Sequence, residues 1–356
     1  MFFIITTNMK KNLFLFLIFT QLPICSLFAQ VDLIFNYACK PKLGLFSKVN
    51  IIDKRVENQS LGFIQNGAFN SVNEIIFLGN LKDSLAKFFL TENDSTTTNS
   101  ELTILLLDLN LSEQTYSFSE KGRLKLAMRL FTSSNNVYFK EILNIDSVYF
   151  VKAGDVTKRL LNSVSVQLFN ISKLAEGNKF NYLPNSPNYT LQELNAIDSI
   201  EKLKIPIYNT NKVKPGIYLN YKNFSANEPD SSIIEIAIKN ERKIVVFSLD
   251  KESNQRTIID NKNVYAVSDG TTVLKATQIG FYKLEKKEND FYYIGQTSAT
   301  NYQSPNVGAA AVAGMAFGLA GAIIANSVAI QNSNKPLHYF KLNYLKGNSV
   351  PIYKLK

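Results

Sequence analysis

Few side chains in this sequence have the types and spacing that catalysis needs. His338, within KPLHYFKLNY, is the single histidine, and that count excludes a histidine-based catalytic triad and a histidine-rich metal site. Cys39 could serve as a thiol nucleophile, but no base is identifiable for it in the sequence. We therefore expect His338 to be an ordinary strand residue and Cys39 to be a partly buried free thiol.

Paired carboxylates are the remaining catalytic possibility, because two of them suffice to hydrolyse a glycosidic bond. The candidates are Asp108 with Glu113 and Asp250 with Glu252, which we interpret as residues at the ends of strands. The motifs HExxH, GxSxG, GxxxxGK[ST] and GxGxxG do not occur. The sequence therefore predicts no enzyme, no catalytic residues, no cofactor and no metal site.

One long uncharged segment, VGAAAVAGMAFGLAGAIIANSVAI at residues 307–330, offers a different kind of site. As a helix it would extend about 36 Å, which exceeds the roughly 30 Å of a bilayer's hydrocarbon core. Its small residues form a GxxxG spacing and a smooth ridge, a pattern that lets helices approach closely in membranes. We expect membrane contact or self-association through Gly308, Gly314, Gly318, Gly321 and Ala322.

The same segment fits less specific interpretations. About eight of its side chains are Val, Leu, Ile or Phe, worth roughly −2.4 to −4.8 kcal/mol for insertion at central positions, whereas Asn326 and Ser327 oppose insertion. A full bilayer crossing is therefore less expected than membrane contact. A helix packed on the neighbouring domain, or a glycine-rich insert, is the alternative.

The N-terminus has the composition of a secretory signal peptide over residues 1–29. Two lysines precede the apolar run at 13–19, and small residues lead to a cleavage position after Ala29. An uncleaved anchor helix is the alternative, but polar residues interrupt the run well short of the roughly 20 residues of a membrane span. Cleavage would remove Cys25 and leave Cys39 alone, so an intrachain disulfide is not expected.

The charge balance limits the partners that we expect. The chain has 39 basic and 29 acidic residues and a formal net charge of +10, which favours anionic partners such as lipid headgroups or glycans. The lysines are scattered among asparagines with no basic block, so we expect no nucleic-acid binding. An envelope protein is a further expected partner, and the oligomeric state stays open.

The periodicity divides the chain into two domains joined by a linker. Residues 31–176 predict an α+β domain with an antiparallel sheet and two helices on one face: a helix capped by Asn80, a three-strand meander from Glu101 to Phe150, and a second helix from the cap Asp155 to Gly177. The Asn- and Pro-rich residues 177–189 predict the linker.

Residues 190–356 predict a mostly β second domain. Thr190 and Glu193 have the spacing of a capping box, and Asp269-Gly270 is a hairpin signal. The segment 307–330 lies between two of the expected strands as a Gly/Ala-rich helical insert.

The order of predicted elements in residues 45–175, with LGFIQNGAFN and SEQTYSFSEKGRL, resembles the small α+β envelope domains of the lipopolysaccharide-assembly lipoprotein and related outer-membrane accessory proteins. The whole chain, with VYAVSDGTTVLKA ahead of a small-residue run, resembles uncharacterised exported proteins of Gram-negative bacteria. The resemblance carries over no catalytic residue, and the lipid-attachment cysteine of the lipoproteins is missing here because Ile24 precedes Cys25.

Together these features predict an exported, non-enzymatic binding or scaffold protein of the periplasm or cell envelope, which touches a membrane through residues 307–330. A membrane-inserting, self-associating protein that uses the same segment as a glycine-zipper-like element is the alternative.

Overall fold

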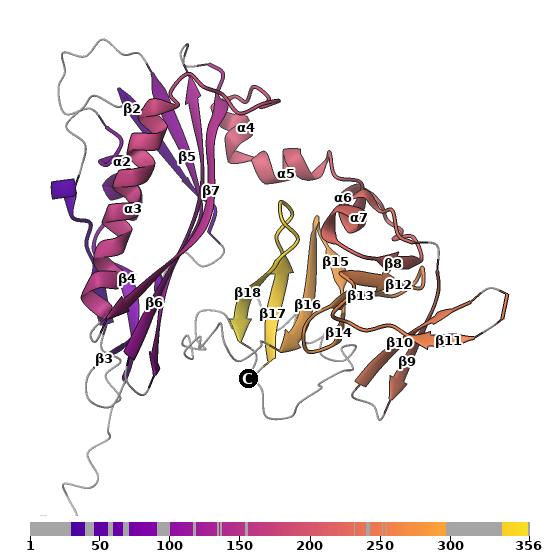
Figure 1. Ribbon diagram of the computed structural model, residues 1–356. Coiled ribbons are helices and arrows are strands. Elements are labelled where there is room, and N and C mark those ends of the chain that lie inside the picture. Colours follow the sequence, from indigo (N-terminus) through magenta and orange to yellow (C-terminus); the bar gives the residue numbers. More distant parts are fainter. Residues whose placement is uncertain are drawn as a thin grey trace, which may run out of the picture.

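The structure is a computed structural model that describes residues 30–39, 46–55, 60–66, 71–90, 100–116, 119–133, 135, 137–153, 156–230, 232–239, 243–250, 252–253, 255–296 and 337–354 (Figure 1). The expected signal peptide at 1–29 and the Gly/Ala-rich segment at 307–330 lie outside these ranges. The described chain is a mixed α+β protein in which strands outnumber helices.

A seven-stranded sheet dominates the N-terminal part of the chain. Its order is β1-β4-β3-β5-β6-β7, and β2 also pairs with β5. The strands are β1 (Gln30–Leu33), β2 (Lys48–Asp53), β3 (Gly62–Asn66), β4 (Ser71–Phe77), β5 (Glu101–Tyr116), β6 (Ser119–Ser133) and β7 (Lys140–Ala153).

This sheet is mixed, which corrects the expectation of an antiparallel sheet. The meander β5-β6-β7 is antiparallel as predicted, but β1 runs parallel to β4, and both β2 and β3 run parallel to β5. The reason is that β2 lies beside residues 101–106 and β3 beside 111–112, so the chain passes along one edge of β5 twice in the same direction. The hydrophobic pattern within a strand does not show which other strand it pairs with.

Two helices cover one face of the sheet (Figure 1). They are α2 (Leu81–Ala86) and α3 (Thr157–Gly177). In α3, Leu160, Val164 and Leu168 recur every four residues and form one buried face of the helix. The same core contains alternate residues of the strands beneath, such as Leu102 of β5 and Leu126 of β6.

The caps explain where these helices begin. The Asn80 side chain accepts hydrogen bonds from the backbone amides of Lys82 and Asp83, as its position before α2 predicts. The cap expected for α3, Asp155, lies outside the described residues, and Val156 precedes the helix without a side-chain cap. The helix α3 ends at Gly177, as predicted.

Two short helices, α4 (Leu191–Asn195) and α5 (Ile197–Lys202), cover one end of the opposite face of the sheet. Leu194 and Ile197 are buried there against Leu105 and Phe131. The predicted capping box is present, because Thr190 and Glu193 exchange their side-chain and backbone hydrogen bonds. Both faces of β5 are thus covered at this end, which explains why the strand is apolar on both sides.

The C-terminal unit runs from α6 to β18 and is built from small sheets. Their orders are β11-β10-β9, β14-β13-β12-β8 and β15-β16-β17-β18. The elements are α6 (Pro206–Asn209), β8 (Gly216–Tyr218), α7 (Tyr221–Ala226), β9 (Ile233–Lys239), β10 (Lys243–Leu249), β11 (Arg256–Ile258), β12 (Ala266–Ser268), β13 (Val273–Ala276), β14 (Phe281–Lys283), β15 (Glu285–Lys287), β16 (Asp290–Gln296), β17 (Leu337–Leu342) and β18 (Ser349–Lys354).

Aromatic side chains form the core of the C-terminal unit. Tyr218, Phe224 and Phe291 are fully buried, and the rings of Phe224 and Phe291 meet nearly edge to face at 5.4 Å. Many rings of these tyrosine-rich strands therefore pack inward.

The strands β16 and β17 pair directly, with Gln296 opposite Leu337. Residues 297–336, which contain the Gly/Ala-rich segment, connect these two partners. Both ends of that connection consequently lie side by side at one end of a strand pair.

Candidate functional site

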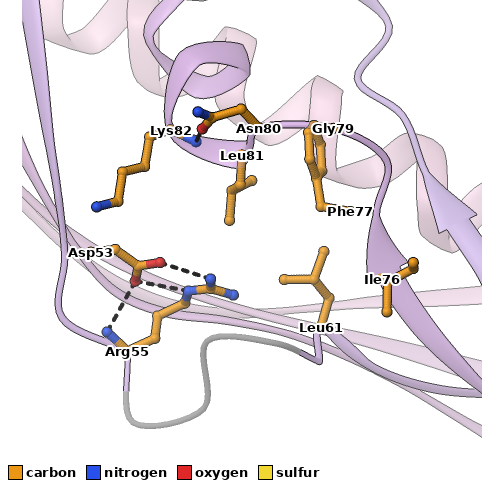
Figure 2. A pocket seen from close by; sticks show the side chains of 9 residues that line it. All are labelled: Asp53, Arg55, Leu61, Ile76, Phe77, Gly79, Asn80, Leu81 and Lys82. Carbon is orange, nitrogen blue, oxygen red and sulfur yellow. Dashed lines mark hydrogen bonds and ion pairs between the residues drawn. The ribbon is translucent and has the colours of Figure 1, made fainter.

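A pocket of about 700 Å³ opens in the N-terminal unit where β2, β3 and β4 diverge (Figure 2). It forms because β2 and β3 follow one another along β5, which leaves room between the end of β2 and the end of β4. The residues that line it are Asp53, Arg55, Leu61, Ile76, Phe77, Gly79, Asn80, Leu81 and Lys82.

One wall of the pocket is an ion pair. Arg55 Nε donates to Asp53 Oδ1 at 2.9 Å, and Arg55 Nη2 donates to Asp53 Oδ2 at 2.8 Å. The two side chains are only 4% and 11% exposed, so this bidentate pair is a fixed part of the wall. Asp53 is thus a partner of Arg55 and is not poised as a general base.

The other wall is apolar. It contains Leu61, Ile76, Phe77 and Leu81, and the Phe77 ring lies 4.7 Å from the ring of Phe35 beneath it. Gly79 stands at the turn into α2 with a φ of +98°, and a Cβ at this position would meet no atom within 4 Å. The pocket is therefore open at this turn.

Lys82 supplies a charge at the rim. Its side chain is exposed and extends toward the side of the pocket where Asp53 lies (Figure 2). Its backbone amide donates to the Asn80 side chain at the start of the helix. An apolar wall, a closed ion pair and an exposed ammonium group suit a molecule with an apolar part and an acidic or polar group. They do not supply a nucleophile with its base.

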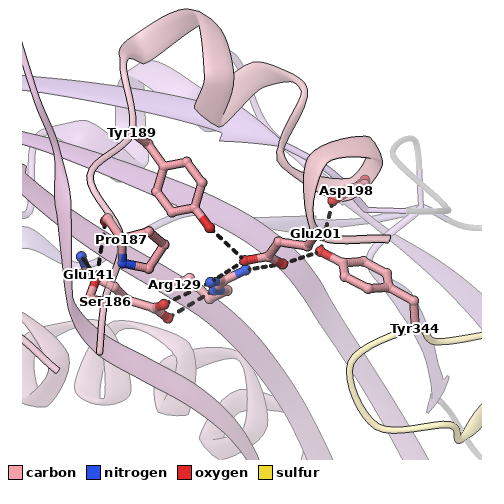
Figure 3. Close-up of polar contacts among 8 residues, drawn as sticks. All are labelled: Arg129, Glu141, Ser186, Pro187, Tyr189, Asp198, Glu201 and Tyr344. Atoms are coloured by element: carbon pink, nitrogen blue, oxygen red, sulfur yellow. Dashed lines mark hydrogen bonds and ion pairs between the residues drawn. The ribbon is translucent and has the colours of Figure 1, made fainter. Parts of the chain in front are cut away.

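A second polar cluster joins the N-terminal unit to the rest of the chain (Figure 3). Arg129 on β6 donates to both carboxylate oxygens of Glu141, at 2.8 and 2.7 Å, and to both of Glu201, at 2.9 Å each. Tyr344, from the β17–β18 turn, donates to Glu201 at 2.8 Å. Arg129 thus links β6 to β7 and α5, and Glu201 in turn links α5 to the β17–β18 turn.

The cluster contains one positive charge and two negative charges, and hydrogen bonds stabilise them. Burial lowers the pKa of the Arg129 guanidinium, but the hydrogen bonds to Glu141 and Glu201 outweigh burial and raise it above its usual value. Burial and the neighbouring Glu201 raise the pKa of Tyr189 to about 12, so its hydroxyl stays protonated and donates to Glu201. One guanidinium thus binds two carboxylates, and the hydroxyls of Tyr189 and Tyr344 also donate to Glu201, so the cluster acts as a structural joint.

The five predicted site residues, Gly308, Gly314, Gly318, Gly321 and Ala322, lie outside the described residues, so the structure does not place them. Cys39 ends the short 3-10 helix Tyr37–Cys39. His338 is buried in β17, between Gly295 of β16 and Lys354 of β18 in register, with its ring 6.0 Å from that of Phe340.

Three of the four candidate acids, Asp108, Glu113 and Asp250, have neighbours or partners other than a second acid. Asp108 and Glu113 lie within β5 and not at its ends, and they point to opposite faces, because Glu113 accepts from Thr157 of α3 whereas Asp108 lies near Lys125. Asp250 accepts hydrogen bonds from the amides of Glu252 and Ser253 and so stabilises a turn.

Two further findings concern the described residues alone. They contain no group of three His, Cys, Asp or Glu side chains that could hold a metal ion. None of their helices combines the length and apolarity that crossing a membrane requires.

Sequence reasoning missed the pocket and the Arg129 cluster. In the sequence, Asp53 is the polar residue at the end of a strand-like run. Arg129 alternates with apolar residues, a pattern typical of a side chain that faces water. The partners Glu141 and Glu201 come from distant positions, and no local signal connects them to Arg129.

No family model matches the chain, and no curated protein matches it. Two solved structures are similar to part of it. An uncharacterised protein has 6% sequence identity, a TM-score of 0.22, and a match over 41% of this chain and 95% of its own. The Xanthomonas campestris protein XCC0632, of the family model DUF330, has 10% identity, a TM-score of 0.25, and a match over 42% of this chain and 95% of its own. Neither is described as an outer-membrane-assembly lipoprotein.

Proposed function

We propose that the protein is a non-enzymatic binding or scaffold protein of the cell envelope, exported by residues 1–29, whose ligand enters the pocket at the start of α2. The pocket carries this proposal, because it combines an apolar wall of Leu61, Ile76, Phe77 and Leu81 with an ammonium group at the rim. The ligand class is an amphipathic molecule with an apolar body and an acidic end.

The rest of the described chemistry agrees with binding. Asp53 is held by Arg55, and Arg129 holds both Glu141 and Glu201. These charged groups are engaged in structural contacts, whereas the pocket presents apolar surface and the Lys82 ammonium group to a ligand.

An apolar sulfonate dye, 1-anilinonaphthalene-8-sulfonate, tests the pocket because it has the proposed chemistry and becomes fluorescent in apolar sites. We expect Lys82→Glu to weaken dye binding about tenfold, since it replaces an attraction with a repulsion at the rim. Lys87→Glu is the matched control, because Lys87 is also exposed and follows the same helix but does not line the pocket. Equal dye binding by both variants would refute the pocket as the site.

Residues 307–330 support a second candidate, membrane contact with self-association. The pairing of Gln296 with Leu337 brings both ends of residues 297–336 together, and this restricts how the segment could meet a membrane. A single helix across the bilayer would separate its ends by about 30 Å. We therefore propose that the segment enters and leaves on the same side of a membrane, with Gly314 and Gly318 at a helix contact.

Cell fractionation with an alkaline carbonate wash tests this second candidate. Because Gln296 and Leu337 are adjacent, residues 298–335 can be replaced by a short Gly-Ser turn that leaves the β16–β17 pair intact. We expect the whole protein to resist the wash and the shortened one to be released. Release of both forms would reject membrane contact through this segment and leave the pocket proposal standing.

A further inference from the structure

Exposed aromatic and apolar side chains gather at the end of the N-terminal unit where α3 ends and β7 begins. We call the group formed by Val137, Tyr138, Leu174, Phe180 and Tyr182 the aromatic patch. Phe180 is 65% exposed, and each of the others is more than a third exposed. These residues come from three chain segments that meet at this end of the sheet.

Hydrogen bonds fix the loop that carries Phe180 and Tyr182. Thr132 Oγ1 donates to the carbonyl of Lys179 at 3.0 Å, and the amide of Leu183 donates to the carbonyl of Glu141 at 2.8 Å. The amide of Asn178 donates to the carbonyl of Leu174 at 3.0 Å. The loop is thus tied to β6, β7 and α3 on either side of the two rings, so their exposure results from a defined backbone course.

Positive charge accompanies the aromatic rings. The Lys140 ammonium lies 5.2 Å from the centroid of the Tyr182 ring, and Lys173 is exposed next to Leu174. The acids nearby are Glu176, in the last turn of α3, and Glu141, which is bound to Arg129. The surface around the patch therefore complements an anionic partner.

We propose that the aromatic patch docks on the headgroup region of an anionic lipid membrane, with Phe180, Tyr182 and Tyr138 in the interface and Lys140 and Lys173 at lipid phosphates. Tyrosine and lysine beside exposed apolar groups suit this boundary, because rings enter the interface while ammonium groups remain hydrated. The proposal rests on the envelope location proposed above and names a partner surface for it.

This contact is separate from the one proposed for residues 307–330. In Figure 1, α3 ends at the top of the N-terminal unit, whereas β16 ends and β17 begins near the lower edge of the C-terminal unit. The patch therefore lies apart from Gln296 and Leu337, the two residues between which that segment is connected.

Tryptophan fluorescence tests the patch, because the chain contains no tryptophan. Phe180→Trp places a single probe in the patch, and Ile258→Trp is the matched control, since Ile258 is 66% exposed on β11 of the C-terminal unit. We expect vesicles of equal phosphatidylglycerol and phosphatidylcholine to shift the emission of Phe180→Trp to shorter wavelength and to leave that of Ile258→Trp unchanged. Vesicles of phosphatidylcholine alone should give a much smaller shift.

Charge variants made in the Phe180→Trp protein complete the test. We expect Lys140→Gln and Lys173→Gln each to weaken binding to the anionic vesicles about fivefold, and Lys222→Gln, an exposed lysine of α7, to have no effect. If the protein sediments with the vesicles but the emission of Phe180→Trp does not change, the patch is not the docking surface. That outcome would leave the envelope proposal intact. Equal shifts at both probes, or a concentration-dependent shift without vesicles, would also overturn the patch as the docking surface.

Discussion

The two units of this protein build their cores from different side chains. The N-terminal unit packs aliphatic residues such as Leu102, Leu126 and Leu160 between long strands and two helices, whereas the C-terminal unit packs Tyr218, Phe224 and their neighbours between strands of three to seven residues. Short strands offer few inward positions, and in this aromatic cluster many of those positions hold a large ring, whereas a smaller cluster on β9, β10 and β13 is mainly aliphatic. Strand length and residue size thus compensate for one another.

The aromatic core also carries polar groups into the interior. The Tyr218 hydroxyl donates to the carbonyl of Lys214 at 2.8 Å, and that of Tyr265 donates to the carbonyl of Gly347 at 2.6 Å. These bonds hold loops that short strands alone would leave unsupported. The aliphatic core gains its stability from apolar burial, while the aromatic core combines burial with hydrogen bonds between rings and loops.

The joint between the units should give the largest effect. Arg129→Ala leaves Glu141 and Glu201 buried without their counter-charge, which we expect to cost about 3–5 kcal/mol. Denaturant unfolding followed by circular dichroism should then show the two units unfolding at separate midpoints. The triple variant Arg129→Met, Glu141→Gln, Glu201→Gln removes all three charges and should recover most of the loss. A loss below about 1 kcal/mol in Arg129→Ala would show that the joint is dispensable.

The N-terminal unit should lose stability as the pH rises through the pKa of one partly buried acid, Asp108. Burial raises the pKa of Asp108 to about 6 from 3.8, although Lys125, Arg123 and Arg55 oppose this. The folded state therefore holds a proton that the unfolded state has released, and stability falls between about pH 4 and pH 7 by at most about 3 kcal/mol. Asp108→Asn should abolish this slope in denaturant titrations, and an unchanged slope would assign it to another group.

The C-terminal unit should respond to pH with the opposite sign. Burial lowers the pKa of Lys275 to about 8 from 10.5, so above pH 8 the unfolded chain binds the proton that the folded chain has lost. Stability should rise by about 2 kcal/mol between pH 8 and just below pH 10. The predicted rise ends there because burial raises the pKa of Tyr265. At higher pH the folded chain keeps a tyrosine proton that the unfolded chain loses, and this lowers the stability. Lys275→Met should remove the rise in the same titrations.

The smallest expected effect concerns one hydroxyl in each core. Tyr218→Phe removes the donor to the Lys214 carbonyl and should cost about 1 kcal/mol. Tyr149→Phe in the N-terminal unit, where Tyr149 packs partly buried against the aliphatic core, should stay within about 0.5 kcal/mol of the wild type. Equal losses in thermal unfolding would contradict the distinction between the two cores.

Local signals predicted much of the fold. The meander β5-β6-β7, the Asn80 cap, the Thr190–Glu193 capping box and the end of α3 at Gly177 all depend on neighbours within a few residues, and all are present. The parallel pairing of β2 and β3 with β5 was missed, because two separate strands share one edge and nothing in either strand encodes its partner.

The candidate site was harder to predict. Along β6, Arg129 alternates with apolar residues, a pattern typical of a side chain that faces water. In the structure α4 and α5 cover that end of the face, and Glu201 binds the guanidinium there. The pocket likewise arises from the space between strands and not from a motif. Both features depend on contacts between residues far apart in the chain, for which the sequence has no periodic signature.

The direct pairing of β16 with β17 has a consequence for how the chain folds. Before Gln296 can meet Leu337, a loop of about 40 residues must close, whereas a hairpin turn closes only two. The difference in loop entropy is on the order of 2–3 kcal/mol, and it opposes the first contact as well as the finished strand pair. The C-terminal hairpin, with Tyr344 in its turn, should therefore be among the last parts to assemble, and the joint to Glu201 forms only after that slow closure.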